Sequence, residues 1–176
     1  MKLIILDQDG VINNDSNLIT KISSEWRPIP GSLEAIAYLN QMGYRVVVAS
    51  NRSCDRKVMD MSAFNAINDK MCKAVNQAGG RIDAIFLSPH TNIEKYSCSK
   101  SLIMMFEEIA QRFGIDLINV PIVGDELRYL RAAAFVGASP IMVLTGKGRI
   151  TKNMKSLPKN TKIFTDLAAV ADTLSK

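Results

Sequence analysis

The stretch Lys2-Leu3-Ile4-Ile5-Leu6-Asp7-Gln8-Asp9-Gly10-Val11-Ile12 joins four consecutive apolar residues to two acids that a single residue separates. A short continuous apolar run is typical of a strand that is buried on both faces of a parallel sheet. The two acids, Asp7 and Asp9, stand where this strand ends, and Gly10 allows a sharp turn after them. Carboxylates this close repel each other unless a cation lies between them. We therefore expect the chemistry of the protein at the end of this strand.

Outward from this stretch, strand and helix patterns alternate along the chain. Further strands are expected over 44–49, 82–87, 120–123, 140–144 and 162–164. Helices are expected over 33–40, 56–78, 102–113, 126–136 and 167–174, with a loop over 88–100. This alternation predicts an α/β fold with a Rossmann-like parallel sheet and helices on both faces. The length of 176 residues suits a single domain over 1–176.

Composition narrows the functional classes. No apolar run approaches the roughly 18 residues of a membrane span, and the start does not read as a signal peptide. Cys54, Cys72 and Cys98 are too few and too scattered for a disulfide framework, which suits a cytoplasmic protein. The net charge of +5 comes from dispersed basic residues, which favours anionic small molecules over nucleic acid. We expect a monomer that binds a small phosphorylated metabolite, without nucleic-acid or membrane partners.

Polar residues follow four of the expected strands. Asp7 and Asp9 follow the first, Ser50 and Asn51 the second, Lys100 the loop after the third, and Gly124-Asp125 the fourth. In α/β sheets, ligands bind outside the carboxyl ends of the strands. These separate segments therefore point to one site at one edge of the sheet.

The residue types in this set favour metal-assisted phosphoryl transfer. Asp7, Asp9 and Asp125 are expected to hold Mg²⁺, a hard cation that binds carboxylates, water and phosphate. Asp7 would also attack phosphorus and form an aspartyl-phosphate. Asp9 would protonate the leaving oxygen and then activate water.

The remaining residues of the set are expected to bind the substrate. The Ser50 hydroxyl and the Lys100 ammonium would hold phosphate oxygens, and Gly10 would turn backbone N–H groups toward the phosphate. Asn51 and Arg52 complete the predicted binding set at the corner after the second strand. Trp26 is open to two interpretations, a platform over the site or a packed loop residue.

In this order and spacing, the motifs resemble the haloacid dehalogenase (HAD) superfamily in its phosphatase branch. The segments 7–13, 28–31, 43–53, 113–117 and 144–148 resemble the group of D,D-heptose 1,7-bisphosphate 7-phosphatases and histidinol phosphatases. The resemblance implies a HAD-like fold with a minimal or absent cap domain. It also implies Mg²⁺-dependent hydrolysis of a sugar phosphate such as D-glycero-D-manno-heptose 1,7-bisphosphate.

Three departures from the family pattern bear on this prediction. Of the four Cys and His ligands of a family zinc loop, the chain keeps only His90 and Cys98, which argues against a structural zinc site. Ser99 replaces an arginine that commonly precedes the motif lysine. Tyr129 replaces a second acid of the fourth motif, and the neighbouring Glu126 is a candidate substitute for it.

Alternatives of different kinds stay open at this point. One is a phosphatase for histidinol phosphate or another small metabolite. Another, motivated by Ser99 and Tyr129, is a catalytically weakened member that binds a phosphorylated ligand or a protein. A response-regulator receiver is disfavoured, because its phosphorylated Asp does not lie at the end of the first strand.

Overall fold

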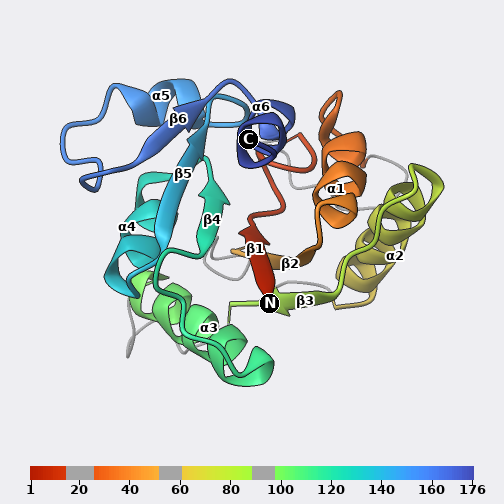
Figure 1. Cartoon of the computed structure of the whole chain (residues 1–176), viewed down its shortest axis with the longest axis horizontal. Coiled ribbons are helices and arrows are strands. Elements are labelled where there is room, and N and C mark those ends of the chain that lie inside the picture. Colours follow the sequence, from red (N-terminus) through yellow and green to blue (C-terminus); the bar gives the residue numbers. More distant parts are fainter. Residues whose placement is uncertain (15–25, 52–60, 89–97) are drawn as a thin grey trace.

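A computed structural model describes residues 1–14, 26–51, 61–88 and 98–176 (Figure 1). Its strands are β1 (Lys2–Leu6), β2 (Tyr44–Ser50), β3 (Ala84–Leu87), β4 (Pro121–Gly124), β5 (Ser139–Val143) and β6 (Lys162–Phe164). Its helices are α1 (Ser32–Gln41), α2 (Met61–Gln77), α3 (Cys98–Phe113), α4 (Leu127–Phe135), α5 (Gly148–Lys152) and α6 (Leu167–Leu174).

The six strands form one sheet in the order β3-β2-β1-β4-β5-β6, and every neighbouring pair is parallel. Helices α1, α2 and α6 cover one face, and α3 and α4 cover the other (Figure 1). This arrangement confirms the predicted Rossmann-like α/β fold.

Strand β1 shows why the opening apolar run is continuous. Ile4 and Leu6 belong to the core under α1, α2 and α6, whereas Leu3 and Ile5 belong to the core under α3 and α4. Because successive side chains of a strand point to opposite faces, burial on both faces requires apolar residues at every position.

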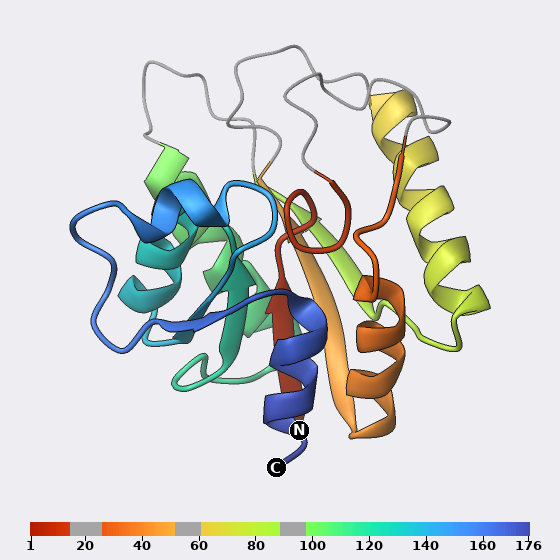
Figure 2. The ribbon, with the colours of Figure 1, turned by 90° about the horizontal axis from the view of Figure 1, so that it is seen from above.

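The strand order also locates the binding edge. From β1 the chain moves outward through β2 and β3, and then returns to place β4 on the other side of β1. This reversal opens a crevice at the carboxyl ends of β1 and β4, where ligands of such sheets bind. In Figure 2 these strands point upward, toward the end of the molecule where α2 and α3 begin.

Two local predictions need correction. The predicted loop over 88–100 is wrong at its end, because residues 98–100 form the first turn of α3. The buried stripe of that helix begins at Ser101 and Leu102, and one preceding turn continues the helix into solvent. The short helix α5 was not predicted, since five residues with only Gly148 and Thr151 buried carry little helical periodicity. No described helix combines the length and apolar character needed to cross a membrane.

Candidate active site

Asp7 is the first residue after β1 and is 5% exposed. Its backbone N–H donates to the carbonyl of Val123 in β4 at 2.9 Å, and its Oδ1 accepts the N–H of Gln8 at 2.8 Å. Burial raises the pKa of this carboxyl well above its usual range, and the charges of Asp125, Asp9 and Glu126 raise it further. Asp7 therefore lies in a buried position where a cation would favour its ionised form.

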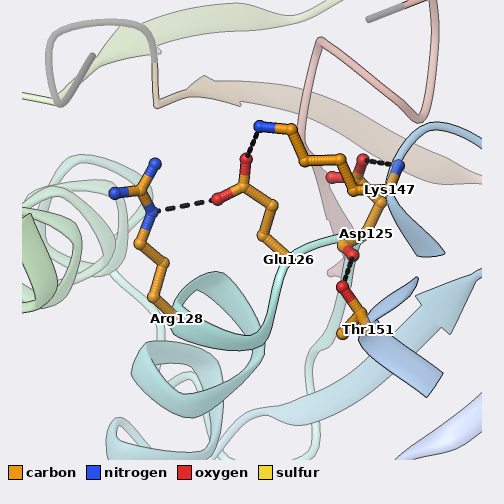
Figure 3. Close-up of polar contacts among 5 residues, drawn as sticks. All are labelled: Asp125, Glu126, Arg128, Lys147 and Thr151. Atoms are coloured by element: carbon orange, nitrogen blue, oxygen red, sulfur yellow. Dashed lines mark hydrogen bonds and ion pairs between the residues drawn. The ribbon is translucent and has the colours of Figure 1, made fainter. Parts of the chain in front are cut away.

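Asp125 lies at the matching position after β4 and is 2% exposed. Figure 3 shows its carboxylate Oδ2 accepting the backbone N–H of Lys147 at 2.7 Å, and its carbonyl accepting the Thr151 hydroxyl at 2.6 Å. The position of Asp125 is thus fixed by strand β4, the loop after β5 and helix α5.

Two glycines explain how the loops after β1 and β5 reach Asp125. Gly10 and Gly146 both have positive φ, of 82° and 56°, and a Cβ on either would overlap with Oδ2 of Asp125. The Thr145 hydroxyl also donates to the carbonyl of Gly10 at 2.6 Å. Glycine is needed at both positions because the backbone approaches the carboxylate closely.

The loop after β1 also orients Asp9. The carbonyl of Asn13 accepts the N–H of Gly10 at 2.8 Å, and its Nδ2 donates to Oδ1 of Asp9 at 2.8 Å. Asn13 is fully buried and was not among the predicted site residues. Its spacing of four residues after Asp9, inside a turn, was the available signal, because Asn side chains commonly bond to nearby turn groups.

Ser50 and Asn51 come from β2, the neighbour of β1 on the other side. Leu6 pairs with Val48 in the sheet register, so the end of β2 lies level with the Asp7–Asp9 segment. Ser50 is fully buried and Asn51 is 9% exposed. Within the described residues, neither Oγ of Ser50 nor Oδ1 of Asn51 has a hydrogen-bond partner. Buried polar atoms normally have partners, so these two are suited to a bound ligand.

The other predicted residues have mixed outcomes. Lys100 is exposed in the first turn of α3. This turn lies toward the edge of the sheet that the carboxyl ends of the strands form (Figure 2). Arg52 and His90 lie outside the described residues, so the prediction on zinc stays untested. Trp26 is 2% exposed and belongs to the core, so its interpretation as a substrate platform is wrong.

The contacts of Glu126 do not indicate that it is a third metal ligand. Its carboxylate accepts from Nζ of Lys147 at 2.8 Å and from Nε of Arg128 at 3.0 Å (Figure 3). In the part of the chain that the structure describes, no three Asp, Glu, His or Cys side chains form a group that could hold an ion alone. Mg²⁺ does not need such a group, because it commonly binds one or two carboxylates together with water and phosphate.

Comparisons with known proteins agree with this geometry. The HAD-hydrolase-like family model matches residues 97–170. D-glycero-beta-D-manno-heptose-1,7-bisphosphate 7-phosphatase of Bordetella bronchiseptica is 49% identical over 99% of this chain and 98% of its own. The enzyme of the same name from Pseudomonas aeruginosa is 42% identical, over 98% and 97% of the two chains.

Solved structures give the same result. The D,D-heptose 1,7-bisphosphate phosphatase of B. bronchiseptica, complexed with magnesium and phosphate, superimposes with a TM-score of 0.92 at 48% identity, over 99% of this chain and 98% of that one. The corresponding protein of Burkholderia thailandensis gives a TM-score of 0.80 at 46% identity, over the full length of both chains. This chain belongs to the phosphatases of the haloacid dehalogenase superfamily.

Proposed function

We propose that this protein is a Mg²⁺-dependent phosphatase that removes the 7-phosphate of D-glycero-D-manno-heptose 1,7-bisphosphate. One observation supports the phosphatase chemistry most strongly: Asp7 and Asp125 are both buried at the crevice between β1 and β4. The substrate is proposed from the full-length similarity to enzymes of that name, which reaches 49% identity.

The residues present fit a magnesium ion. Burial and neighbouring negative charges both raise the pKa of Asp7, and among the described residues no Lys or Arg forms an ion pair with it. A divalent cation held by Asp7 and Asp125 would offset both effects. When bound, Mg²⁺ would neutralise the charge of the phosphate and of the carboxylates. The direct participation of the Asp9 carboxylate in this site stays a prediction.

Asp7 is the proposed nucleophile. One of its carboxylate oxygens attacks phosphorus, the bond to the sugar oxygen breaks, and an aspartyl-phosphate forms. Asp9 gives its proton to the departing sugar oxygen, and then takes a proton from the water that attacks the phosphoryl group. Inorganic phosphate leaves, and Asp7 is restored. Asn13 supports this role of Asp9, because its amide holds Oδ1 of the carboxyl group.

The proposed phosphate-binding residues are Ser50, Lys100 and Arg52. The Ser50 hydroxyl, which has no hydrogen-bond partner among the described residues, would donate to a phosphate oxygen. The Lys100 ammonium and the Arg52 guanidinium would balance the charge of the phosphate. Gly10 lets the loop after β1 approach Asp125 closely, because a Cβ at this position would overlap the Asp125 carboxylate.

The test is phosphate release from a panel that contains heptose 1,7-bisphosphate, heptose 7-phosphate, fructose 1,6-bisphosphate and histidinol phosphate, with Mg²⁺ and with EDTA. We expect Mg²⁺-dependent release that is fastest on heptose 1,7-bisphosphate, with one phosphate removed per sugar. Faster release from histidinol phosphate would overturn the proposed substrate but not the proposed phosphatase activity. Binding of inorganic phosphate without turnover of any compound would overturn the enzyme and favour a phospho-ligand-binding protein.

A further inference from the structure

Tyr129 is the largest fully buried side chain among the described residues, and it lies on α4 four residues after Asp125. Its hydroxyl donates to the carbonyl of Ala49 at 3.1 Å. Ala49 directly precedes Ser50 at the end of β2. A hydrogen bond from α4 therefore acts on the backbone that carries the proposed phosphate-binding serine.

The ring of Tyr129 also contacts the other half of the site. A Cβ added to Gly124 would lie 2.5 Å from Cδ1 of Tyr129, so this glycine is needed for the ring to pack against β4. Gly124 directly precedes Asp125. The same side chain thus contacts the residue before Ser50 and the residue before Asp125, on the two strands that flank β1.

The position of the ring is well determined. Phe106 of α3 packs edge-on against it, with ring centroids 5.2 Å apart and planes at 86°, a favourable aromatic geometry. Burial and the charges of Asp7 and Asp125 raise the pKa of the Tyr129 hydroxyl well above its usual range. This favours the protonated hydroxyl, which donates to the carbonyl of Ala49.

The hydroxyl of Ser50 takes its position from the backbone at the end of β2. Its Oγ has no hydrogen-bond partner within the described residues. Its backbone pairs with Leu87 of β3, and the bond from Tyr129 to the carbonyl of Ala49 adds a contact from helix α4. We propose that Tyr129 is a positioning residue, which fixes the Ser50 end of β2 relative to Asp125 and thereby sets the affinity of the site for phosphate. This inference rests on the proposed phosphatase site.

Tyr129→Phe removes the hydroxyl and keeps the ring. We expect the affinity for inorganic phosphate, measured by calorimetry in the presence of Mg²⁺, to fall about fivefold or more, as for a lost hydrogen bond of about 1 kcal/mol. The KM for substrate should rise in parallel, whereas the Mg²⁺ concentration for half-maximal activity should change less than about twofold, because Asp125 keeps its own bonds to Lys147 and Thr151.

Phe106→Leu is the matched control, because it removes the aromatic partner of the same ring without touching the hydroxyl bond. It should lower the melting temperature at least as much as Tyr129→Phe, yet leave phosphate affinity unchanged. Equal phosphate affinity in wild type and Tyr129→Phe, or an equal loss in Phe106→Leu, would overturn the inference. Failure of the wild type itself to bind phosphate would overturn the proposed function instead, so the two failures are distinguishable.

Discussion

The two halves of the proposed site differ in how the oxygens proposed to bind metal and phosphate are satisfied. In the metal half, formed by Asp7 and Asp125 with the loops after β1 and β5, carboxylate oxygens accept backbone N–H groups. In the phosphate half, formed by Ser50 at the end of β2 and by Asn51 after it, buried oxygens have no partner among the described residues. The fold therefore holds the carboxylates of the proposed metal half by its own contacts, whereas two buried oxygens of the proposed phosphate half are suited to a ligand.

The largest expected effect is on the metal half. Asp7→Asn should lower kcat about 10³-fold or more, because the amide is a poor nucleophile and a poor ligand for Mg²⁺. Phosphate release under saturating substrate measures this effect, and Asp172→Asn on the exposed side of α6 is the control. Activity within tenfold of wild type in Asp7→Asn would remove Asp7 from the mechanism.

The same variant should have the opposite effect on stability. The pKa of Asp7 is raised in the folded protein, so folding favours its protonated form. In EDTA, the wild type should thus lose stability as pH rises from about 4, the unfolded pKa, up to the raised folded pKa. Asp7→Asn should lack this loss and melt at a higher temperature at neutral pH. A lower melting temperature than wild type in EDTA would contradict the account of Asp7.

The close approach of the two loops gives the next prediction. Gly10→Ala should lower kcat about 100-fold, because its Cβ would displace the Asp125 carboxylate. Gly43→Ala is a matched control, with a φ of 84° against 82° and no atom within 4 Å of the added Cβ. Both variants should lose roughly 1–2 kcal/mol of stability from backbone strain, and only Gly10→Ala should lose activity. An equal loss of activity in both would mean that strain, and not the contact, is responsible.

The sequence predicts some features of the fold and of the candidate site but not others. The apolar run before Asp7 and the polar residues after each strand predict the sheet and its binding edge, since both depend on local patterns. The contact of Thr145 with Gly10 joins residues that are 135 positions apart, so no local pattern reveals it. The two-sided contacts of Tyr129 likewise depend on tertiary packing, and the exposed first turn of α3 carries no apolar pattern that would predict it.

A serine substitution tests the phosphate half directly. Ser50→Ala should weaken phosphate binding and lower kcat/KM about 10–100-fold, without lowering the melting temperature, because the lost hydroxyl has no described protein partner. Ser32→Ala should behave oppositely, since that buried hydroxyl donates to the carbonyl of Ile12 at 2.7 Å and its loss costs about 1 kcal/mol. A destabilised Ser50→Ala protein would show that the hydroxyl already has a structural partner.

The smallest expected effect concerns Glu126, which lies beside the metal half. Glu126→Gln should change the Mg²⁺ concentration for half-maximal activity less than about threefold, because this partly exposed carboxylate pairs with Lys147 and Arg128 and such pairs contribute at most about 1 kcal/mol. A Mg²⁺ titration of activity measures the change. A loss of tenfold or more would make Glu126 a ligand that replaces the acid absent at Tyr129.

The central claim, that Asp7 carries the phosphoryl group, can be tested by trapping. The enzyme is mixed with substrate and Mg²⁺, quenched with borohydride, and digested for mass spectrometry, because borohydride reduces an aspartyl-phosphate to homoserine. The account predicts homoserine at position 7 only, and none in EDTA. Turnover without this conversion, or conversion at another aspartate, would contradict it.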